Sequence, residues 1–311
     1  MVNLSIKEET KIELADKIIE KFSKSNSKVK HDEKVYKYKK INTWCIKHIQ
    51  IENKKLTLKD IMCADYLKLC KIKQQFENKI EEWKKLNADD FMKETLYGSS
   101  FPRTEFFSSI NINVCPYCNR NFINSYKNVS TYELDHFFPK SEYPLLAVSF
   151  ENLIPVCPAC NRRKKKELID YSPYNKKYDI DSLLQFSYVL KNINYLSDKS
   201  SIAISINAKN IIIQKNIDVL ELEKLYQTHI DIVQECIKKG MVYSEEYISS
   251  LINTYPNVFE SKENIYQIIF NNYFKIEDYC KRPLAKMTKD IVKEVFEALY
   301  AVDIDEIFLI E

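Results

Sequence analysis

Four cysteines in two closely spaced pairs are the residues of this 311-residue sequence best suited to bind a metal ion. Cys115 and Cys118 enclose Pro-Tyr, and Cys157 and Cys160 enclose Pro-Ala. Zinc takes four thiolates in tetrahedral geometry, and two such turns supply them. Because residues 119–156 separate the pairs, one ion would join two ends of a structural unit. We therefore predict a structural zinc site, which stabilises the fold but performs no chemistry.

An Asp-His dipeptide between the cysteine pairs carries groups suited to hydrolysis. His136 can act as a general base near neutral pH, and Asp135 offers the carboxylate oxygens that a hard divalent cation prefers. Asn161 directly follows the last cysteine, so a bound zinc would fix the direction of its amide. Phosphodiester cleavage needs a base, water and a divalent ion. We expect His136 to activate water while Asp135 and Asn161 bind Mg²⁺ or Mn²⁺.

Basic residues follow this group directly, because residues 162–166 read Arg-Arg-Lys-Lys-Lys. Such a run suits a phosphate backbone, although a solvated helix face is the alternative interpretation. The candidate nucleic-acid ligands are Arg162, Lys165, Lys166 and Lys140. Glu133 would share a strand face with Asp135, and it is either a further metal or water ligand or a solvated carboxylate.

The elements that must position these groups follow the order strand, loop, strand, helix. Residues 130–138 have strand-like content that ends at Pro139, and residues 148–156 form a second strand candidate. A helix is expected from near Cys160 onward. Neighbouring residues of a regular strand point to opposite faces, so the Asp-His pair can flank one site only where the strand ends.

With these elements in place, the segment from Cys115 to Lys166 resembles the ββα-metal motif of HNH endonucleases that carry two Cys-x-x-Cys knuckles. The residues that carry the resemblance are Glu133, Asp135, His136, Asn152 and Asn161. The resemblance implies that His136 is the general base and that Asp135 and Asn161 bind the catalytic ion. It also implies that Asn152 holds the loop between the strands.

A second resemblance concerns the residues around the Asp-His pair. The stretch from Tyr132 to Lys140, with the residues after it, is similar to the nuclease subunit of Septu-type anti-phage systems. That resemblance implies a defence role beside an ATPase partner. We expect DNA rather than RNA as the substrate. Three alternatives are an RNA- or tRNA-cleaving HNH effector, a zinc-dependent nucleic-acid-binding module without catalysis, and a thiol redox protein, against which the second cysteine pair argues.

The flanking sequence predicts helices on both sides of this core. Apolar residues at spacings of three and four predict an N-terminal helix over residues 12–22 and one long helix over residues 69–83. Residues 186–190 and 202–206 predict a hairpin, and Ser244 and Ser261 are candidate helix caps. We therefore predict a mostly helical α+β fold. Its three regions are an N-terminal helical region (1–100), a nuclease core (101–175) and a C-terminal hairpin-and-helix region (176–311).

Composition excludes several classes of protein. The formal net charge of +3 is too small to indicate a partner, and 45% hydrophobic with 29% charged residues is ordinary for a globular protein. Nine cysteines do not make a disulfide scaffold in a chain of this length. No apolar run approaches the length of a membrane span, and no signal peptide precedes the chain, so we expect a cytoplasmic protein without membrane contact.

Overall fold

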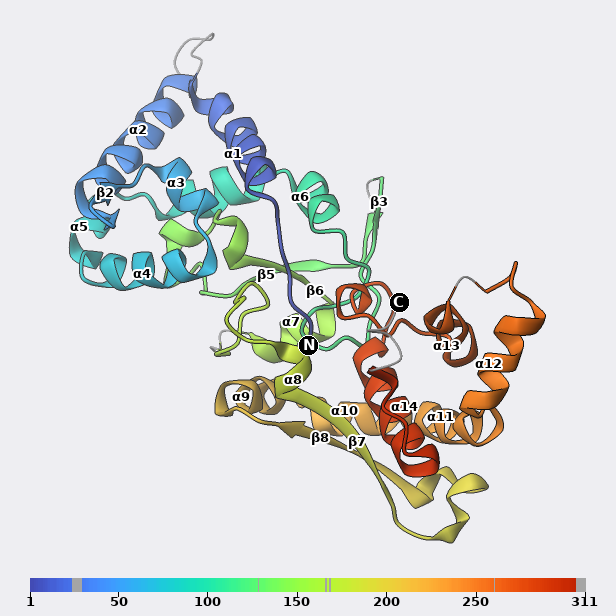
Figure 1. Cartoon of the computed structure of the whole chain (residues 1–311). Coiled ribbons are helices and arrows are strands. Elements are labelled where there is room, and N and C mark those ends of the chain that lie inside the picture. The colour runs from blue at the N-terminus through green and yellow to red at the C-terminus, as the bar shows by residue number, and fades with distance from the viewer. Residues whose placement is uncertain (24–29, 128, 166, 168, 260, 306–311) are drawn as a thin grey trace.

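The elements of the chain fall into three groups along the sequence (Figure 1). The structure is a computed structural model that describes residues 1–305 except 24–29, 128, 166, 168 and 260. Helices dominate, and the described strands form two-stranded sheets. The predicted mostly helical α+β fold is confirmed. Within the described residues, no helix is long and apolar enough to cross a membrane.

The N-terminal elements are mainly helices, and polar side chains cap the starts of two of these helices. The elements are α1 (Glu8–Ser23), α2 (Lys30–His48), β1 (Gln50–Ile51), β2 (Lys54–Lys55), α3 (Leu58–Cys63), α4 (Tyr66–Glu77), α5 (Ile80–Lys84), the π-helix η1 (Phe91–Ser100) and α6 (Arg103–Ile110). Thr57 and Asp60 form a capping box at α3, and Asp65 accepts a hydrogen bond from the Lys68 amide at the start of α4. These side chains satisfy amides that a helix leaves unpaired.

The single long helix predicted over residues 69–83 is wrong, because the chain turns between α4 and α5. The Lys79 amide donates to Phe76 O (2.9 Å), three residues back, which tightens the backbone at the end of α4. The turn lets Phe76 and Trp83 both contact the Trp44 ring, with centroids 6.1 and 5.0 Å away. Apolar spacing therefore reported the buried face correctly but not the break, which tertiary packing decides.

The central segment has the predicted order of strand, loop, strand and helix. Its elements are β3 (Ser125–Tyr126), β4 (Val129–Ser130), β5 (Glu133–His136), η2 (Pro144–Leu146), η3 (Phe150–Asn152), β6 (Leu153–Val156) and α7 (Pro158–Lys164). The strands β5 and β6 are antiparallel, and His136 pairs with Leu153. β5 ends at His136, two residues before the predicted end of the strand, and β6 covers only the last four residues of the second predicted strand (148–156). Figure 1 shows α7 below this pair of strands.

In the C-terminal region, helices pack on a β-hairpin. The elements are α8 (Ile180–Leu183), β7 (Leu184–Leu190), η4 (Ile193–Leu196), η5 (Lys199–Ser201), β8 (Ile202–Ala208), α9 (Ile211–Val219), α10 (Leu222–Tyr226), η6 (Gln227–His229), α11 (Ile230–Val242), α12 (Glu245–Thr254), α13 (Lys262–Phe270), η7 (Ile276–Asp278) and α14 (Ala285–Tyr300). The predicted hairpin is confirmed as β7 and β8. Ser244 and Ser261 cap α12 and α13, as predicted. Gly240 lets α11 approach α14, because a Cβ there would lie 2.4 Å from Val295 Cγ1.

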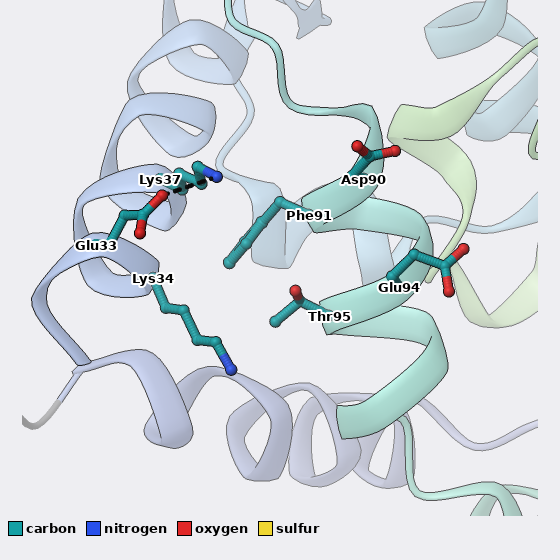
Figure 2. A pocket seen from close by; sticks show the side chains of 7 residues that line it. All are labelled: Glu33, Lys34, Lys37, Asp90, Phe91, Glu94 and Thr95. Atoms are coloured by element: carbon teal, nitrogen blue, oxygen red, sulfur yellow. Dashed lines mark ion pairs between the residues drawn. The ribbon is translucent and has the colours of Figure 1, made fainter. Parts of the chain in front are cut away.

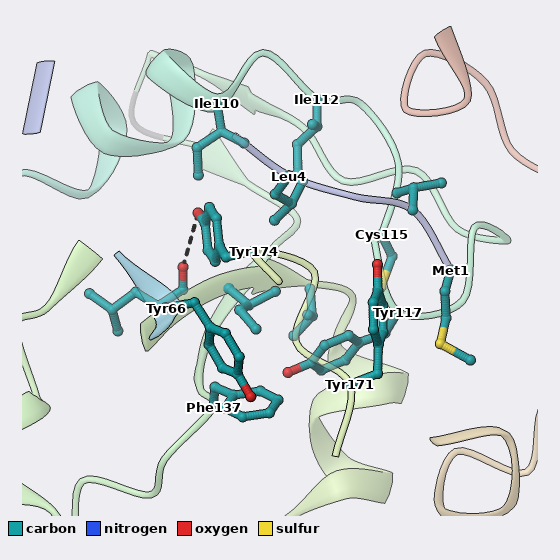
Figure 3. Packing of buried hydrophobic residues seen from close by; sticks show 14 of the residues in the cluster. Met1, Leu4, Tyr66, Ile110, Ile112, Cys115, Tyr117, Phe137, Tyr171 and Tyr174 are labelled. Carbon is teal, nitrogen blue, oxygen red and sulfur yellow. Dashed lines mark hydrogen bonds between the residues drawn. The ribbon is translucent and has the colours of Figure 1, made fainter. Parts of the chain in front are cut away.

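Buried apolar side chains form one cluster that runs through all three regions. The first residues of the chain enter this cluster: the Val2 amide donates to Pro116 O (3.0 Å), and the Leu4 amide donates to Pro173 O (2.8 Å). Figure 3 shows Met1 beside Cys115 and Tyr117 of the first cysteine pair. The region boundaries near residues 100 and 175 stay a prediction.

Candidate active site and metal centre

The four paired cysteines converge on one point. The sulfur atoms of Cys115, Cys118, Cys157 and Cys160 all lie within 4.8 Å of one another, and all four side chains are buried. Cys118 Sγ and Cys157 Sγ are 4.0 Å apart. A tetrahedral zinc ion with bonds of about 2.3 Å places its sulfur ligands about 3.8 Å apart. The number, type and spacing of these donors therefore fit a structural zinc ion.

Polar groups around the cysteines donate hydrogen bonds to two of the sulfur atoms. The Asn121 side chain donates to Cys157 Sγ (3.2 Å), and the Arg120 amide donates to Cys118 Sγ (3.4 Å). Hydrogen bonds from the neighbouring thiols and from Asn121 lower the pKa of Cys157, whereas burial raises the pKa of Cys115. Thiolates are the form that binds zinc. The other described thiols lie outside this cluster, and Cys45, Cys63, Cys236 and Cys280 are buried as small apolar residues.

Asp135 is buried on the face of β5 that points to the cysteines. Its Oδ2 accepts a hydrogen bond from the Tyr117 hydroxyl (2.6 Å), and its Oδ1 lies 3.1 Å from Lys164 Nζ. Tyr117 stands between two zinc-ligand candidates, so the first cysteine pair positions this carboxylate directly. Burial raises the pKa of Asp135, while Lys164 and Tyr117 act in the opposite direction.

Neither partner of Asp135 was predicted from the sequence. Lys164 belongs to the basic run that was expected to lie at the surface. Lys164 is instead fully buried, and its ammonium group also donates to His136 O (3.1 Å). Its spacing was a usable signal: it follows the buried Cys160 by four residues, which places both on one face of α7.

His136 points away from Asp135, into a pocket formed by η1 and the loop after β5. Its ring packs edge-on against Tyr97, with centroids 4.5 Å apart, and its Nε2 lies 3.0 Å from the Ala147 carbonyl oxygen. A carbonyl only accepts hydrogen bonds, so Nε2 carries the proton of the neutral ring and Nδ1 keeps a free lone pair. Burial lowers the pKa of His136 to about 3, which keeps the ring neutral.

Asn152 is fully buried and ties the chain together beyond β5. Its Oδ1 accepts from the Phe138 amide (2.8 Å), and its Nδ2 donates to Phe138 O (3.2 Å) and Leu146 O (2.9 Å). Leu146 precedes Ala147, whose carbonyl contacts His136. The amide thus fixes the loop that holds the imidazole.

Asn161 contacts Glu133 rather than Asp135. Its Nδ2 donates to Glu133 Oε2 (2.7 Å), across the interface between α7 and β5. A carboxylate accepts hydrogen bonds, so the amide must turn its NH₂ group toward Glu133 and its Oδ1 away. Within the described residues, Oδ1 has no hydrogen-bond partner. The structure therefore pairs Glu133 with Asn161, and Asp135 with Tyr117 and Lys164.

Comparison with known proteins places this arrangement in a family. Residues 115–167 match the HNH endonuclease family model. This segment is an HNH endonuclease domain. The resemblance inferred from the sequence is thereby confirmed, and with it the prediction of a nuclease. The Septu protein PtuB of Bacillus thuringiensis is 27% identical over 187 residues, which are 54% of this chain and 67% of that protein. No solved structure matches the chain.

The basic side chains of the HNH domain have different environments. Arg162 and Lys165 are exposed, whereas Arg163 pairs with Glu221 of the C-terminal region (3.4 Å). Lys166 lies outside the described residues. Lys140 is half-buried, and its Nζ lies 4.6 Å from the centre of the Tyr97 ring that also touches His136. The run is therefore not one continuous phosphate-binding face.

A cavity of about 460 Å³ lies away from the HNH domain, between α2 and η1 (Figure 2). Its lining mixes acidic and basic side chains, and Glu33 and Lys37 form an ion pair across 3.1 Å. Phe91 reaches into the same space from η1. Among the described residues, the lining includes no cysteine or histidine, unlike the HNH domain.

Substituting Lys164 by methionine is expected to lower the free energy of unfolding by about 3–5 kcal/mol, because the Asp135 carboxylate would stay buried without its cation. Urea unfolding of the zinc-loaded protein at pH 7 measures this loss. Adding Asp135→Asn should recover part of it, which a double-mutant cycle detects. Lys84→Met is the matched control: Lys84 forms an exposed ion pair with Glu81 (2.7 Å), so its loss should cost under about 1 kcal/mol. Equal losses in the two variants would contradict the buried ion pair.

Proposed function

We propose that the HNH domain hydrolyses phosphodiester bonds of DNA with His136 as the general base. The observation that carries this proposal is the contact of His136 Nε2 with the Ala147 carbonyl (3.0 Å). This contact leaves Nδ1 as the basic atom of a neutral ring. Nδ1 takes a proton from water while the water oxygen bonds to phosphorus. The bond from phosphorus to the leaving oxygen breaks, and that oxygen takes a proton from solvent.

We propose Asp135 and Asn161 as the protein ligands of a divalent ion, Mg²⁺ or Mn²⁺. Carboxylate and amide oxygens are donors that these ions prefer, and one or two protein ligands with several waters suffice for Mg²⁺. The free Oδ1 of Asn161 supports this assignment. An ionised carboxylate has about four acceptor positions, so the bonds of Asp135 to Tyr117 and Lys164 leave it further capacity. When bound, the ion neutralises charge that develops on the phosphate and the leaving oxygen.

Glu133 and Asn152 act as positioning residues in this proposal. Glu133 holds the NH₂ group of Asn161, which aims the amide oxygen away from the strand. Asn152 binds Leu146 O and both backbone groups of Phe138, so it keeps the loop around His136 in one conformation. The exposed Arg162 and Lys165 are proposed phosphate ligands, and the half-buried Lys140 is a third near the base.

We propose further that the chain is the nuclease of an anti-phage defence system and acts in the cytoplasm with an ATPase partner. The likeness to Septu protein PtuB over 187 residues supports the defence role. Reduced thiols at all described cysteines suit a reducing compartment. The ATPase partner follows from the resemblance to Septu-type systems alone, so it needs its own experimental arm.

The test is a cleavage assay with the purified full-length chain. Supercoiled plasmid, single-stranded DNA and RNA are incubated with the zinc-loaded chain and Mn²⁺, Mg²⁺ or no added divalent ion, alone and with an ATPase encoded beside the gene. We expect plasmid cleavage that needs added Mn²⁺ or Mg²⁺. Preferential cleavage of RNA would replace the DNA assignment. Tight binding without cleavage in every arm would favour a zinc-dependent binding module.

A further inference from the structure

A groove of about 510 Å³ runs beside the HNH strands. Of the site residues described above, its lining includes Glu133. Its lining includes Tyr97, Arg103, Ser125, Lys127, Tyr132 and Glu133, which come from η1, α6, the β3–β4 hairpin and β5. Figure 1 shows the hairpin projecting alongside α6. Tyr132 supports the wall: it stacks on Phe107 (4.2 Å), and its hydroxyl donates to Arg103 O (3.0 Å).

Two cations of this groove are held in place without a carboxylate partner. The Arg103 guanidinium lies 4.4 Å from the centre of the Tyr97 ring, and its Nη1 donates to the Tyr97 hydroxyl (3.1 Å). Lys127 is exposed on the hairpin, 5.3 Å from the Tyr126 ring. Across the described residues, neither cation forms an ion pair with Asp or Glu. Both therefore keep a positive charge available to a ligand.

One aromatic ring, that of Tyr97, lies between the groove and the proposed general base. Tyr97 contacts His136 with one edge, and Arg103 and Lys140 both lie over it. Burial lowers the pKa of Lys140, while the charge of Glu94 acts in the opposite direction, and the two residues make no ion pair within 4 Å. A ligand held by Arg103 would thus be separated from the imidazole only by the Tyr97 ring.

We propose that this groove binds the phosphate backbone of the nucleic acid and guides it to His136, with Arg103 and Lys127 as phosphate ligands. The inference rests on the proposed nuclease function. Arginine and lysine, with the hydroxyl groups of Ser125 and Ser130 on the same wall, are the side chains that contact phosphate and sugar in nucleic-acid complexes. Glu133, the acidic group of the lining, is already bonded to Asn161 and faces the catalytic end.

The test measures binding rather than cleavage, so its result does not depend on catalysis. Fluorescein-labelled duplex DNA, single-stranded DNA and RNA of one sequence are titrated with the zinc-loaded full-length chain, without added Mg²⁺ or Mn²⁺. The variant Arg103→Gln/Lys127→Gln should weaken binding of the tightest probe about tenfold at moderate salt. The slope of log affinity against log salt should fall by about 1.8, because each lost phosphate contact removes about 0.9.

The matched control is Lys55→Gln/Lys238→Gln, which removes the same charge from exposed lysines on β2 and α11. This control should keep the salt slope of the unmodified chain, and circular dichroism should show all variants folded. Three results would overturn the assignment of the groove as a phosphate-binding site. They are equal salt slopes for the groove variant and the unmodified chain, equal losses of affinity in the groove and control variants, or no binding to any probe. A chain that binds through the groove but never cleaves with Mn²⁺ would refute only the nuclease proposal.

Discussion

Replacing Cys157 with serine is expected to release the structural metal and unfold the HNH domain. A structural zinc site contributes about 10–16 kcal/mol of apparent free energy, whereas a whole domain is stable by only about 5–15 kcal/mol. Serine supplies no thiolate, and three cysteines no longer complete the tetrahedral set. We expect less than one zinc per chain by elemental analysis and no cooperative thermal transition of the core by circular dichroism.

The loss should spread beyond the HNH domain, because the first cysteine pair joins distant parts of the chain. The Tyr226 hydroxyl of the C-terminal region donates to Cys118 O (2.6 Å), and the Asn119 side chain donates to Tyr279 O (2.8 Å). Limited proteolysis should therefore cut the C-terminal region faster in the variant. Cys236→Ser is the control, since Cys236 is a buried thiol outside the cluster and this variant should retain zinc. A folded, zinc-free and active Cys157→Ser protein would refute the structural-zinc assignment.

Replacing His136 with alanine is expected to lower divalent-dependent cleavage by about 10²–10⁴-fold, the usual contribution of a positioned general base. Zinc content should not change, because His136 points away from Asp135 and the cysteines. The measurement is the single-turnover rate of plasmid nicking with saturating Mn²⁺. Free imidazole should restore part of the rate, since the substitution leaves a cavity next to Tyr97 and Ala147 that a base can enter.

The control for this experiment is His229→Ala. His229 lies in the C-terminal half of the chain, where its Nε2 accepts a hydrogen bond from Arg120 Nε (3.0 Å). It has no proposed role in catalysis. Its removal should leave the cleavage rate within about twofold and cost only stability, as expected for a half-buried hydrogen bond. An unchanged rate in His136→Ala, with unchanged folding, would remove His136 from the mechanism. Rescue by imidazole would separate a lost base from a merely distorted site.

Local patterns were sufficient for much of this protein. The spacing of the cysteines predicted the metal cluster, because two tight turns are enough to present four sulfur atoms. The Asp-His pair, Asn152 and Asn161 predicted the HNH motif that the family comparison bears out. The hairpin of β7 and β8 and the caps at Ser244 and Ser261 depend on neighbouring residues and were found from the sequence alone.

Contacts between distant segments could not be read from such patterns. The sequence indicated that Phe76 and Trp83 are buried, but their common contact with Trp44 requires the chain to turn between α4 and α5. Arg103 gave no signal of its proposed role, since only the packing of α6 beside β3 and η1 brings it next to the Tyr97 ring that touches His136. Periodicity identifies the buried face of one element and not the element that covers it.

Lys164 shows this division most clearly. Its position in a basic run indicated an exposed side chain, whereas the structure buries its ammonium group against Asp135, which lies 29 residues earlier in the chain. By itself, the sequence indicated which groups could bind metal and which group is suited to act as base. The tertiary structure decided which partner each group has, because a buried charge must be neutralised by whatever residue the packing of α7 on β5 brings within reach.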